Sequence, residues 1–389
     1  MTGETVQATA APSNISADDL VIEAIEVIPV RVPLVKTYQG SNYSMTNRCT
    51  IVTRVHTRNG LVSEVYNGDT DAEQAVIVDI IRNEIVPHLL GRTALSVEAC
   101  WEAMLPPTYD ILRDRSLALQ AIACLDSALW DLVGKALGIP LFRLWGGYRD
   151  RLPAICIGGY YSDDEADIAR QIEWYRELGF AGCKFKVGRL SPAEDAHRTR
   201  LARKAGGDDF VLMVDANQGY TRQEAIEFAR LTEDLGLRWF EEPVRWLNDR
   251  LSMRDVRLTT GVRVTAGQSE DTRAGLRDLI SAGAVDACNA DASWIGGPSE
   301  WRRVAALASM FEVEMAHHEE PQVSAHLLAS IPHGTYLETF DPDRDPIFWN
   351  LIANRAPFAG GDYAVPEGPG FGLELDWDYI SRYRSEPAS

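Results

Sequence analysis

The sequence predicts an α/β protein, in which a barrel of parallel strands and helices carries a smaller α+β domain. The chain has 389 residues, too long for one ordinary compact domain but suited to a barrel with an attached domain. After Gly146-Gly147 a unit repeats, in which a short apolar run and a polar turn precede an amphipathic stretch. Four polar clusters each close an apolar run at nearly even steps, as expected at one end of such a barrel: Lys184-Phe185-Lys186, Asp215-Ala216-Asn217, Glu241-Glu242-Pro243 and Gly267-Gln268-Ser269-Glu270.

The first domain is expected to begin with β structure. Apolar side chains alternate with others in residues 20–35, and the prolines there favour an edge strand. Residues 50–65 predict a hairpin around Arg58-Asn59-Gly60. Apolar spacings of three and four then predict helices at 71–89, 96–104 and 116–137.

The barrel is expected to contain eight strands and seven helices. The strands are predicted near 152–158, 182–187, 210–215, 238–241, 262–268, 284–289, 313–317 and 335–338. The helices are predicted to begin near Asp164, Pro192, Arg222, Leu251, Asp271, Pro298 and Pro321.

We divide the chain into four segments on this basis. They are a disordered leader (1–18), the α+β domain (19–148), a (β/α)7β barrel (149–358) and a C-terminal segment (359–389). Residues 362–383 read as irregular and aromatic, suited to packing back on the first domain.

Composition restricts the partners and the compartment. Lys and Arg number 38 against 57 Asp and Glu, a net charge of −19 that repels nucleic acid and anionic bilayers. Six cysteines without a CxxC pair are typical of buried thiols in a reducing compartment. The first 19 residues lack the features of a secretory signal, and no apolar run suggests a membrane span. We therefore expect a cytoplasmic protein that binds neither nucleic acid nor membrane.

Each polar cluster is weak evidence by itself. A Lys-x-Lys usually lies on a solvated face, an Asp-Ala-Asn usually forms a turn or cap, and a Glu-Glu-Pro commonly ends an element. Their joint order and spacing instead predict one site at the strand ends. Because side chains two apart on a strand share a face, Lys184 and Lys186 point the same way.

Three further segments complete a resemblance that runs from about Leu20 to the C-terminus. The first is the run 121–132 followed by Gly134-Lys135 and Pro140, the second is Asp291 before Gly296-Gly297, and the third is His318 with Glu338 twenty residues later. Together with the four clusters they resemble the enolase superfamily, specifically its mandelate racemase-like branch. The resemblance implies a modified (β/α)7β TIM barrel with an N-terminal α+β capping domain that the C-terminal tail completes.

The resemblance also implies the site residues. Abstraction of a proton next to a carboxylate gives an enediolate, whose charge a divalent cation stabilises. The implied roles are a Mg²⁺ site at Asp215, Glu241 and Gln268, a base at Lys186, a His318–Asp291 dyad, and a substrate carboxylate held by Lys184 and Glu338. The neighbouring charges are expected to lower the pKa of both lysines, so that Lys186 can act near neutral pH.

One position departs from the family pattern. Gln268 stands where the third metal ligand is usually Glu, although an amide oxygen can bind a hard cation, and the glucarate dehydratases are similar in using an amide. If the strand continues, Glu270 shares the face of Gln268 and provides an alternative ligand.

Other candidates come from loops. Tyr43 and Asn47 lie in the polar segment 37–48, which is expected to form either a lid or an ordinary surface loop. His317 is a rival of His318 and a candidate for substrate binding, and His326 is expected to pack in or cap a helix. The remaining candidates either line the pocket or pack beneath its rim: Tyr160, Tyr161, Asn217 and Trp294.

The resemblance implies a Mg²⁺-dependent enzyme that abstracts the α-proton of a small anionic hydroxy acid, foremost an acid-sugar dehydratase. The nearest alternative is a racemase or epimerase, and cycloisomerisation is less favoured. A different alternative is a catalytically silent barrel that binds a ligand. We expect a homo-oligomer.

Overall fold

Eight parallel strands close into the predicted barrel in this computed structural model, which describes residues 20–385. Seven strands pair side by side in the order β10-β9-β8-β7-β6-β5-β4, and β11 pairs with β4. The backbone N–H of Met315 donates to His333 over 2.8 Å and Met315 bridges Gly334, which joins β10 to the segment before β11. The fold class predicted from the sequence is therefore confirmed, whereas the predicted leader lies outside the described residues.

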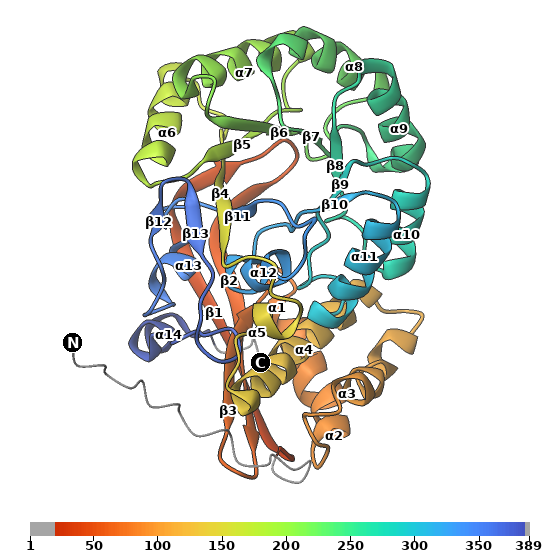
Figure 1. The fold of residues 1–389 in the computed structure, drawn as a ribbon, viewed down its shortest axis with the longest axis vertical. Helices are drawn as coiled ribbons and strands as arrows, with labels where there is room; N and C mark the ends of the chain where they lie inside the picture. The colour runs from red at the N-terminus through yellow and green to blue at the C-terminus, as the bar shows by residue number, and fades with distance from the viewer. Residues whose placement is uncertain (1–19, 386–389) are drawn as a thin grey trace, which may run out of the picture.

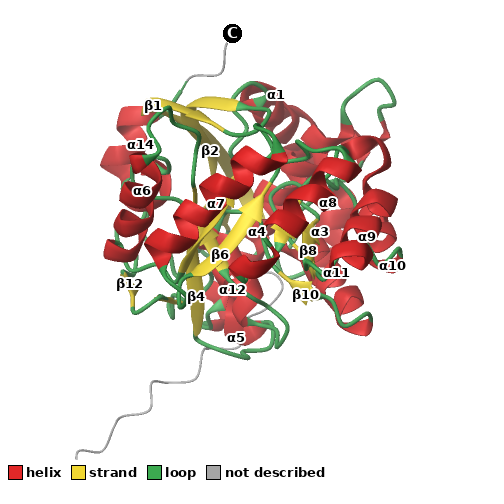
Figure 2. Ribbon diagram, turned by 90° about the horizontal axis from the view of Figure 1, so that it is seen from above, coloured by secondary structure: helices red, strands yellow, loops and turns green. Residues whose placement is uncertain are grey.

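The barrel elements follow the expected order, and helices surround the strands (Figure 2). The strands are β4 (Arg151–Gly158), β5 (Gly182–Lys186), β6 (Val211–Asp215), β7 (Phe240–Glu241), β8 (Val264–Ala266), β9 (Ala287–Cys288), β10 (Glu314–Met315) and β11 (Leu337–Thr339). The helices are α6 (Ala166–Glu177), α7 (Pro192–Gly206), α8 (Arg222–Leu231), α9 (Asp249–Thr260), α10 (Arg273–Ser281), α11 (Pro298–Met310) and α12 (Pro321–Ala329).

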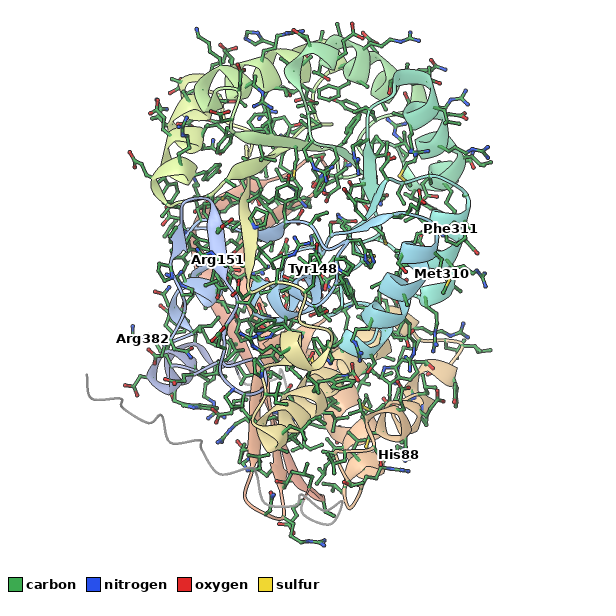
Figure 3. The ribbon with its side chains drawn as sticks, viewed as in Figure 1. His88, Tyr148, Arg151, Met310, Phe311 and Arg382 are labelled. Carbon is green, nitrogen blue, oxygen red and sulfur yellow. The ribbon has the colours of Figure 1, made fainter. Side chains whose placement is uncertain are left out.

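Local sequence explains where these helices start. Ser191 and Glu194 form a reciprocal capping box at α7, and Thr221 and Glu224 form another at α8, so the first free backbone N–H groups find acceptors. Met310 and Phe311, where α11 ends, stand on the outer surface (Figure 3).

The barrel interior has an apolar floor. Buried Ile155, Met213, Trp239, Ala287 and Ala316 form one cluster there. Met213 and Trp239 lie two residues before Asp215 and Glu241, so on each strand the apolar side chain and the acid share the inward face. The acids consequently occupy the layer at the carboxyl ends of the strands, where barrels carry their sites.

The capping domain is a three-stranded antiparallel sheet with helices packed on it (Figure 1). The sheet contains β1 (Ile22–Gln39), β2 (Ser44–Thr57) and β3 (Val62–Asn67). The region predicted as one helix at 71–89 consists of α1 (Gln74–Asp79), a π-helical stretch (Ile80–Ile85) and α2 (Val86–Leu89). α3 (Val97–Ala103), a 3₁₀ turn (Pro106–Tyr109), α4 (Arg115–Leu137) and α5 (Leu141–Leu144) complete the domain.

The loop predicted at 37–48 is wrong for most of its length. Tyr38 pairs with Met45 and Gln39 with Ser44, so β1 and β2 continue past the sheet as a hairpin whose turn is 40–43. Polar side chains suggested a loop because this hairpin leaves the core of its own domain. Its tip contacts the barrel instead: Ser41 Oγ donates to the carbonyl of Ala216 over 2.8 Å, and Asn42 Nδ2 donates to that of Asn217 over 3.2 Å.

α4 is the central helix of the capping domain. Asp114 caps its first turn, and Gly138 ends it with a φ of 68°, a left-handed conformation that glycine adopts without strain. Among the described residues it is also the helix that is long and apolar enough to cross a membrane, but its apolar window is mostly buried inside the protein. The prediction that no apolar run approaches this length is therefore wrong, and α4 packs as a core helix.

The C-terminal segment serves both parts of the molecule. After α13 (Pro346–Asn350), β12 (Phe358–Ala359) and β13 (Asp362–Ala364) form a hairpin, and β13 pairs antiparallel with β4 of the barrel. α14 (Trp377–Tyr383) lies against β1, and the N–H of Ser385 donates to the carbonyl of Pro29 over 2.9 Å. Residues 362–364 thus extend the barrel sheet rather than being irregular, whereas α14 packs on the first domain as expected.

Candidate active site

Three predicted residues share one level of the barrel. Lys186 is the register partner of Asp215 across β5 and β6, and Asp215 is the partner of Glu241 across β6 and β7. All three are buried. Because adjacent parallel strands end together here, side chains from separate segments of the chain meet without any loop having to place them.

Both lysines are held by carboxylates. Lys186 Nζ lies 2.7 Å from Asp215 Oδ2 and donates to Asn217 Oδ1 over 3.0 Å. Lys184 Nζ bridges the barrel interior, at 2.7 Å from Glu241 Oε1 and 2.8 Å from Glu338 Oε2.

These pairs reverse the expected direction of the lysine pKa values. Burial alone would lower the pKa of Lys186, but Asp215 and neighbouring tyrosines raise it well above its usual range. The pKa of Lys184 is likewise raised by Glu241 and Glu338 against the effect of burial. The prediction of lowered values is wrong, because each ammonium lies within 2.8 Å of a carboxylate that favours its charged form.

The predicted metal ligands retain free oxygen acceptors. Within residues 20–385 no three His, Cys, Asp or Glu side chains group as a metal site, and the predicted set contains only two carboxylates. Glu241 Oε2 and Gln268 Oε1 are nevertheless buried without a hydrogen-bond partner. Buried oxygens without donors are unfavourable unless a cation or water completes them, so these residues fit an oxygen-ligated metal.

Sequence reasoning missed the residue that orients Gln268. Gln268 Nε2 donates to Glu242 Oε2 over 2.9 Å, and Ser269 Oγ donates to Glu242 Oε1 over 2.5 Å. The contact with Glu242 shows that Oε1 is the acceptor atom of the Gln268 amide that is left free. Glu242 is buried at a φ of 37°, whereas the Glu-Glu-Pro motif alone predicts a role only for Glu241.

Glu270 does not join this set. β8 ends at Ala266, and the N–H of Glu270 donates to the carbonyl of Gly267, so residues 267–270 form a turn instead of continuing the strand. The Glu270 carboxylate pairs with Arg250 at 2.6 Å. The face-sharing argument for Glu270 therefore fails, and the structure favours Gln268 as the third ligand.

His318 lies between two carboxylates. Its Nδ1 is 3.0 Å from Asp291 Oδ2, as the predicted dyad requires, and its Nε2 is 3.3 Å from Glu319 Oε1. Burial alone would lower the pKa of His318, but Glu319 and Asp291 raise it well above its usual range. The imidazole is therefore held as a cation.

Glu319 is a second residue that the sequence did not reveal. It has a φ of 51° and is held by Arg48 of the capping domain, whose Nη1 lies 2.9 Å from Glu319 Oε2. Arg48 also contacts Asp69 at 3.3 Å and Asp345 at 3.2 Å. The capping domain thus fixes a carboxylate next to His318, which no motif in the barrel indicates.

The other two histidines have structural surroundings. His317 Nε2 accepts from the N–H of Ala292 and its Nδ1 contacts the carbonyl of His318, so backbone groups occupy both ring nitrogens and leave none for a substrate. The substrate-binding prediction for His317 is therefore wrong. His326 is buried within α12, as expected.

The loop candidates divide into two groups. The Tyr43 ring centre lies 5.6 Å from Lys186 Nζ, and the Trp294 ring lies 5.2 Å from that of His318, with its indole N–H buried and without a partner. Tyr160 OH accepts from Arg344. By contrast, Tyr161 OH donates to Asp195, and Asn47 Nδ2 donates to Asp71, so these two are engaged in their own surroundings.

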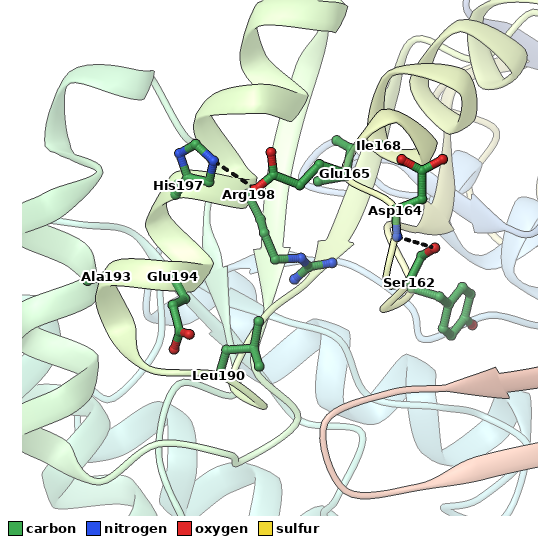
Figure 4. A pocket seen from close by; sticks show the side chains of 10 residues that line it. Ser162, Asp164, Glu165, Ile168, Leu190, Ala193, Glu194, His197 and Arg198 are labelled. Carbon is green, nitrogen blue, oxygen red and sulfur yellow. Dashed lines mark hydrogen bonds and ion pairs between the residues drawn. The ribbon is translucent and has the colours of Figure 1, made fainter.

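A cavity of about 430 Å³ lies beside this site, between the starts of α6 and α7 (Figure 4). Its walls include Leu190 and the exposed pair His197 and Glu165, whose side chains are joined in the figure. Arg198 turns inward and donates to the carbonyls of Lys186 and Gly159. Tyr160 is the one candidate site residue that lines this cavity, so the cavity is separate from the lysines, the acids and His318.

Two protein families match the chain. Residues 23–146 match the mandelate racemase / muconate lactonizing enzyme N-terminal domain, and residues 167–379 match the enolase C-terminal domain-like family. The chain is 32% identical to the 3,6-anhydro-alpha-L-galactonate cycloisomerase of Streptomyces coelicolor, over 93% of this chain and 99% of that protein. It is 30% identical to the arabinonate dehydratase of Saccharolobus solfataricus, over 86% and 90%.

Solved structures share the whole architecture. A mandelate racemase/muconate lactonizing enzyme has a TM-score of 0.93 and 52% identity, covering 94% of this chain and 100% of its own. One from a marine actinobacterium, in complex with magnesium, has a TM-score of 0.90 and 51% identity, covering 94% and 100%. The L-talarate dehydratase of Polaromonas sp. JS666, complexed with Mg and L-glucarate, has a TM-score of 0.87 and 27% identity, covering 94% and 98%.

Proposed function

The chain belongs to the mandelate racemase / muconate lactonizing enzyme family of the enolase superfamily, and from that premise we propose that it is a Mg²⁺-dependent acid-sugar dehydratase. One observation carries the proposal. Lys186 ends β5, and the His318–Asp291 pair lies after β10 and β9, at the same end of one barrel. Counted through β4 and β11, β10 is the third strand from β5. A base and an acid are thereby available to a single bound molecule.

The expected metal site fits the residues present, since Glu241 and Gln268 each keep a free buried oxygen and Glu241 is the register partner of Asp215. Mg²⁺ held by these three side chains would supply positive charge that stabilises the enediolate formed from the substrate carboxylate. The other steps belong to the side chains themselves.

Lys186 is the proposed base. In its neutral form it takes the α-proton, and the electrons of the broken C–H bond form the double bond of the enediolate. The pairing with Asp215 opposes this deprotonation, so the carboxylate charge must be offset before Lys186 can act. Lys184 and Glu338 hold the carboxylate of the substrate.

His318 is the proposed acid. Its raised pKa keeps a proton on the ring, which it gives to the departing β-hydroxyl as the C–O bond breaks. Water leaves, and the enol that remains becomes a 2-keto-3-deoxy acid. Asp291 holds the ring orientation throughout, because it contacts Nδ1. The proton on Nε2, which faces Glu319 Oε1 at 3.3 Å, is the one that His318 gives up.

Cycloisomerisation is the second candidate, favoured by the Streptomyces coelicolor relative named above. It requires the same enediolate, with ring opening in place of loss of water. A racemase or epimerase would also use Lys186 and His318, with the proton returned to carbon. Assignment of the individual residue roles, a cytoplasmic location and a homo-oligomer stay predictions.

The test is incubation of the protein with Mg²⁺ and a panel of mono- and diacid sugars in deuterated water. We expect α-carbon exchange together with a 2-keto-3-deoxy product. NMR measures the exchange, and mass spectrometry identifies the product. Exchange with inverted configuration and no keto product would support racemisation instead. No exchange with any acid, and no heat on titration with Mg²⁺, would favour a silent barrel.

A further inference from the structure

Three arginines are buried within residues 20–385: Arg48, Arg198 and Arg344. Arg48 contacts three carboxylates, and Arg198 pairs with Asp195 at 2.9 Å. Arg344 is 1% exposed, yet it forms no ion pair with any acid in this part of the chain. A buried guanidinium without an anion is unfavourable, so its surroundings need an explanation beyond stability.

The contacts of Arg344 are weak acceptors and aromatic faces. Nε donates to Tyr160 OH over 3.1 Å, Nη2 lies 2.7 Å from Met45 Sδ, and Nη1 is buried without a partner. The guanidinium carbon lies 4.2 Å from the ring centre of Phe340 and 5.7 Å from that of Tyr38. These aromatic rings fix the side chain without neutralising it.

The nearby acids are committed elsewhere. Asp341 Oδ1 accepts from the backbone N–H groups of Asp343 and Arg344. Asp345 and Glu319 both pair with Arg48. Three acids therefore lie near Arg344, and none of them forms an ion pair with its guanidinium.

Arg344 stands on the side of the barrel end that faces the proposed metal ligands. It follows β11, and its partner Tyr160 follows β4. These two strands lie between β10 and β5, whereas Asp215, Glu241 and Gln268 come from β6, β7 and the turn after β8. Tyr43 packs with Tyr160 in the same aromatic cluster and reaches Lys186.

We propose that Arg344 binds the second carboxylate of the substrate, which makes the substrate class the diacid sugars rather than the monoacid sugars. The inference rests on the proposed function, since one carboxylate is taken to lie at Lys184 and the metal ligands. A sugar chain that starts there and crosses the barrel end meets Arg344 with its far terminus. The planar guanidinium fork suits a carboxylate, and a chain of net charge −19 needs local cations to hold a dianion.

The turnover experiment compares galactarate with galactonate, which differ only in the oxidation state of one terminus. We expect the protein to prefer galactarate, and Arg344→Met to lower the galactarate-to-galactonate ratio of kcat/KM by at least about 30-fold. Arg344→Lys should recover part of that ratio, because it restores the charge without the fork. A ratio that Arg344→Met leaves unaltered would overturn the inference.

The matched control is Arg355→Met. Arg355 also stacks on aromatic rings, at 4.1 Å from Trp349 and 5.6 Å from Phe348, but it lies between α13 and β12. This control should not change the ratio. If Arg344 were merely structural, Arg344→Met would lower the Tm and reduce turnover of both acids alike, whereas removal of an unpaired buried charge should not lower the Tm.

A binding measurement separates this inference from the proposed reaction. In a Lys186→Ala background with Mg²⁺ present, calorimetric titration compares galactarate with galactonate before and after Arg344→Met. Tighter galactarate binding that depends on Arg344 supports the inference even if no acid is turned over, which would reject the dehydratase alone. Turnover with binding of galactarate that does not depend on Arg344 rejects the inference and leaves the dehydratase standing.

Discussion

Gln268 donates its Nε2 to Glu242 Oε2 over 2.9 Å, which leaves Oε1 as the buried atom of the amide without a partner. An amide makes this arrangement possible because it carries a donor and an acceptor on one planar group. The negative charge that a glutamate at 268 would provide is found one residue after Glu241, on Glu242. The departure from the family pattern at Gln268 is thus accompanied by a carboxylate that accepts from the amide.

The first prediction concerns Gln268→Glu. A carboxylate there would face Glu242 without a shared proton, so we expect weaker Mg²⁺ binding by about tenfold or more, despite the added negative charge. Adding Glu242→Gln to the same protein should restore binding, because an N–H donor then faces the new carboxylate. Calorimetric Mg²⁺ titration of the four proteins of this double-mutant cycle measures the coupling, expected at about 1–3 kcal/mol.

The control for that cycle is Glu270→Gln. Glu270 pairs with Arg250 and not with the proposed ligands. The Glu270→Gln protein should therefore bind Mg²⁺ with the affinity of the unmodified protein. Additive effects in the cycle, or a loss of affinity in the control, would show that the turn 267–270 supplies the metal ligands in another way.

The second prediction separates the two halves of the reaction. Lys186→Ala should abolish α-proton exchange, whereas His318→Asn should retain exchange and lose formation of the keto product by about 10²–10⁴-fold. His197→Asn, on an exposed helix position, serves as the control. Exchange and product formation lost together in His318→Asn would argue that His318 takes part in the proton abstraction, as in a racemase.

The third prediction concerns metal removal. Mg²⁺ at about 100 times its dissociation constant should raise the free energy of unfolding by about 2.7 kcal/mol relative to protein in EDTA. Asp215→Asn removes one ligand charge and should abolish most of that difference. Thermal unfolding with and without Mg²⁺ measures both, and an equal Tm in the two conditions would contradict the metal site.

Much of the fold was predictable because its signals are local and repeated. The apolar runs that end in Lys186, Asp215 and Glu241 have the period and spacing of strands, and parallel strands that start at one end must finish at the other. What the sequence could not reveal depends on contacts between distant segments. Arg48 and Glu319 are separated by 271 positions, and neither stands in a motif.

The predictions for the hairpin at 37–48 and for Glu270 are wrong for a related reason. The alternation used to recognise a strand assumes a buried face within the same domain, whereas residues 37–48 lie against the barrel. At Glu270, the face-sharing argument assumed that β8 continued, although it ends at Ala266. The predicted direction of the lysine pKa shifts is wrong because it leaves out the carboxylates, which lie 2.7 Å from Lys184 and Lys186.

The last prediction is the effect of pH on stability through His326. Its Nδ1 accepts from the N–H of Phe142 over 3.2 Å, and its Nε2 contacts the carbonyl of Phe371 over 3.0 Å, where a neutral ring donates. Burial lowers the pKa of His326 to about 3 from an ordinary value of 6.5. A proton added at Nδ1 would also confront the N–H of Phe142, so the folded protein resists protonation.

The direction of this pH dependence follows from the number of protons that the folded and unfolded states bind. Above pH 6.5 the ring is neutral in both states, and His326 contributes nothing to the pH dependence. Between pH 6.5 and about 3 the unfolded chain binds a proton that the folded protein does not, so this contribution to stability falls as the pH falls. With 1.36 kcal/mol per unit of pKa, the loss at pH 5 is about 2 kcal/mol.

His326→Gln removes the titrating ring and retains a side chain with a donor and an acceptor. Its free energy of unfolding, measured in urea at pH 7.0 and pH 5.0, should decline less on acidification than that of the unmodified protein, by about 2 kcal/mol. All carboxylates are common to the two proteins, so the difference between their slopes isolates His326. Identical slopes would mean that the ring takes up a proton in the folded state as readily as in the unfolded chain, against the burial and backbone contacts that surround it.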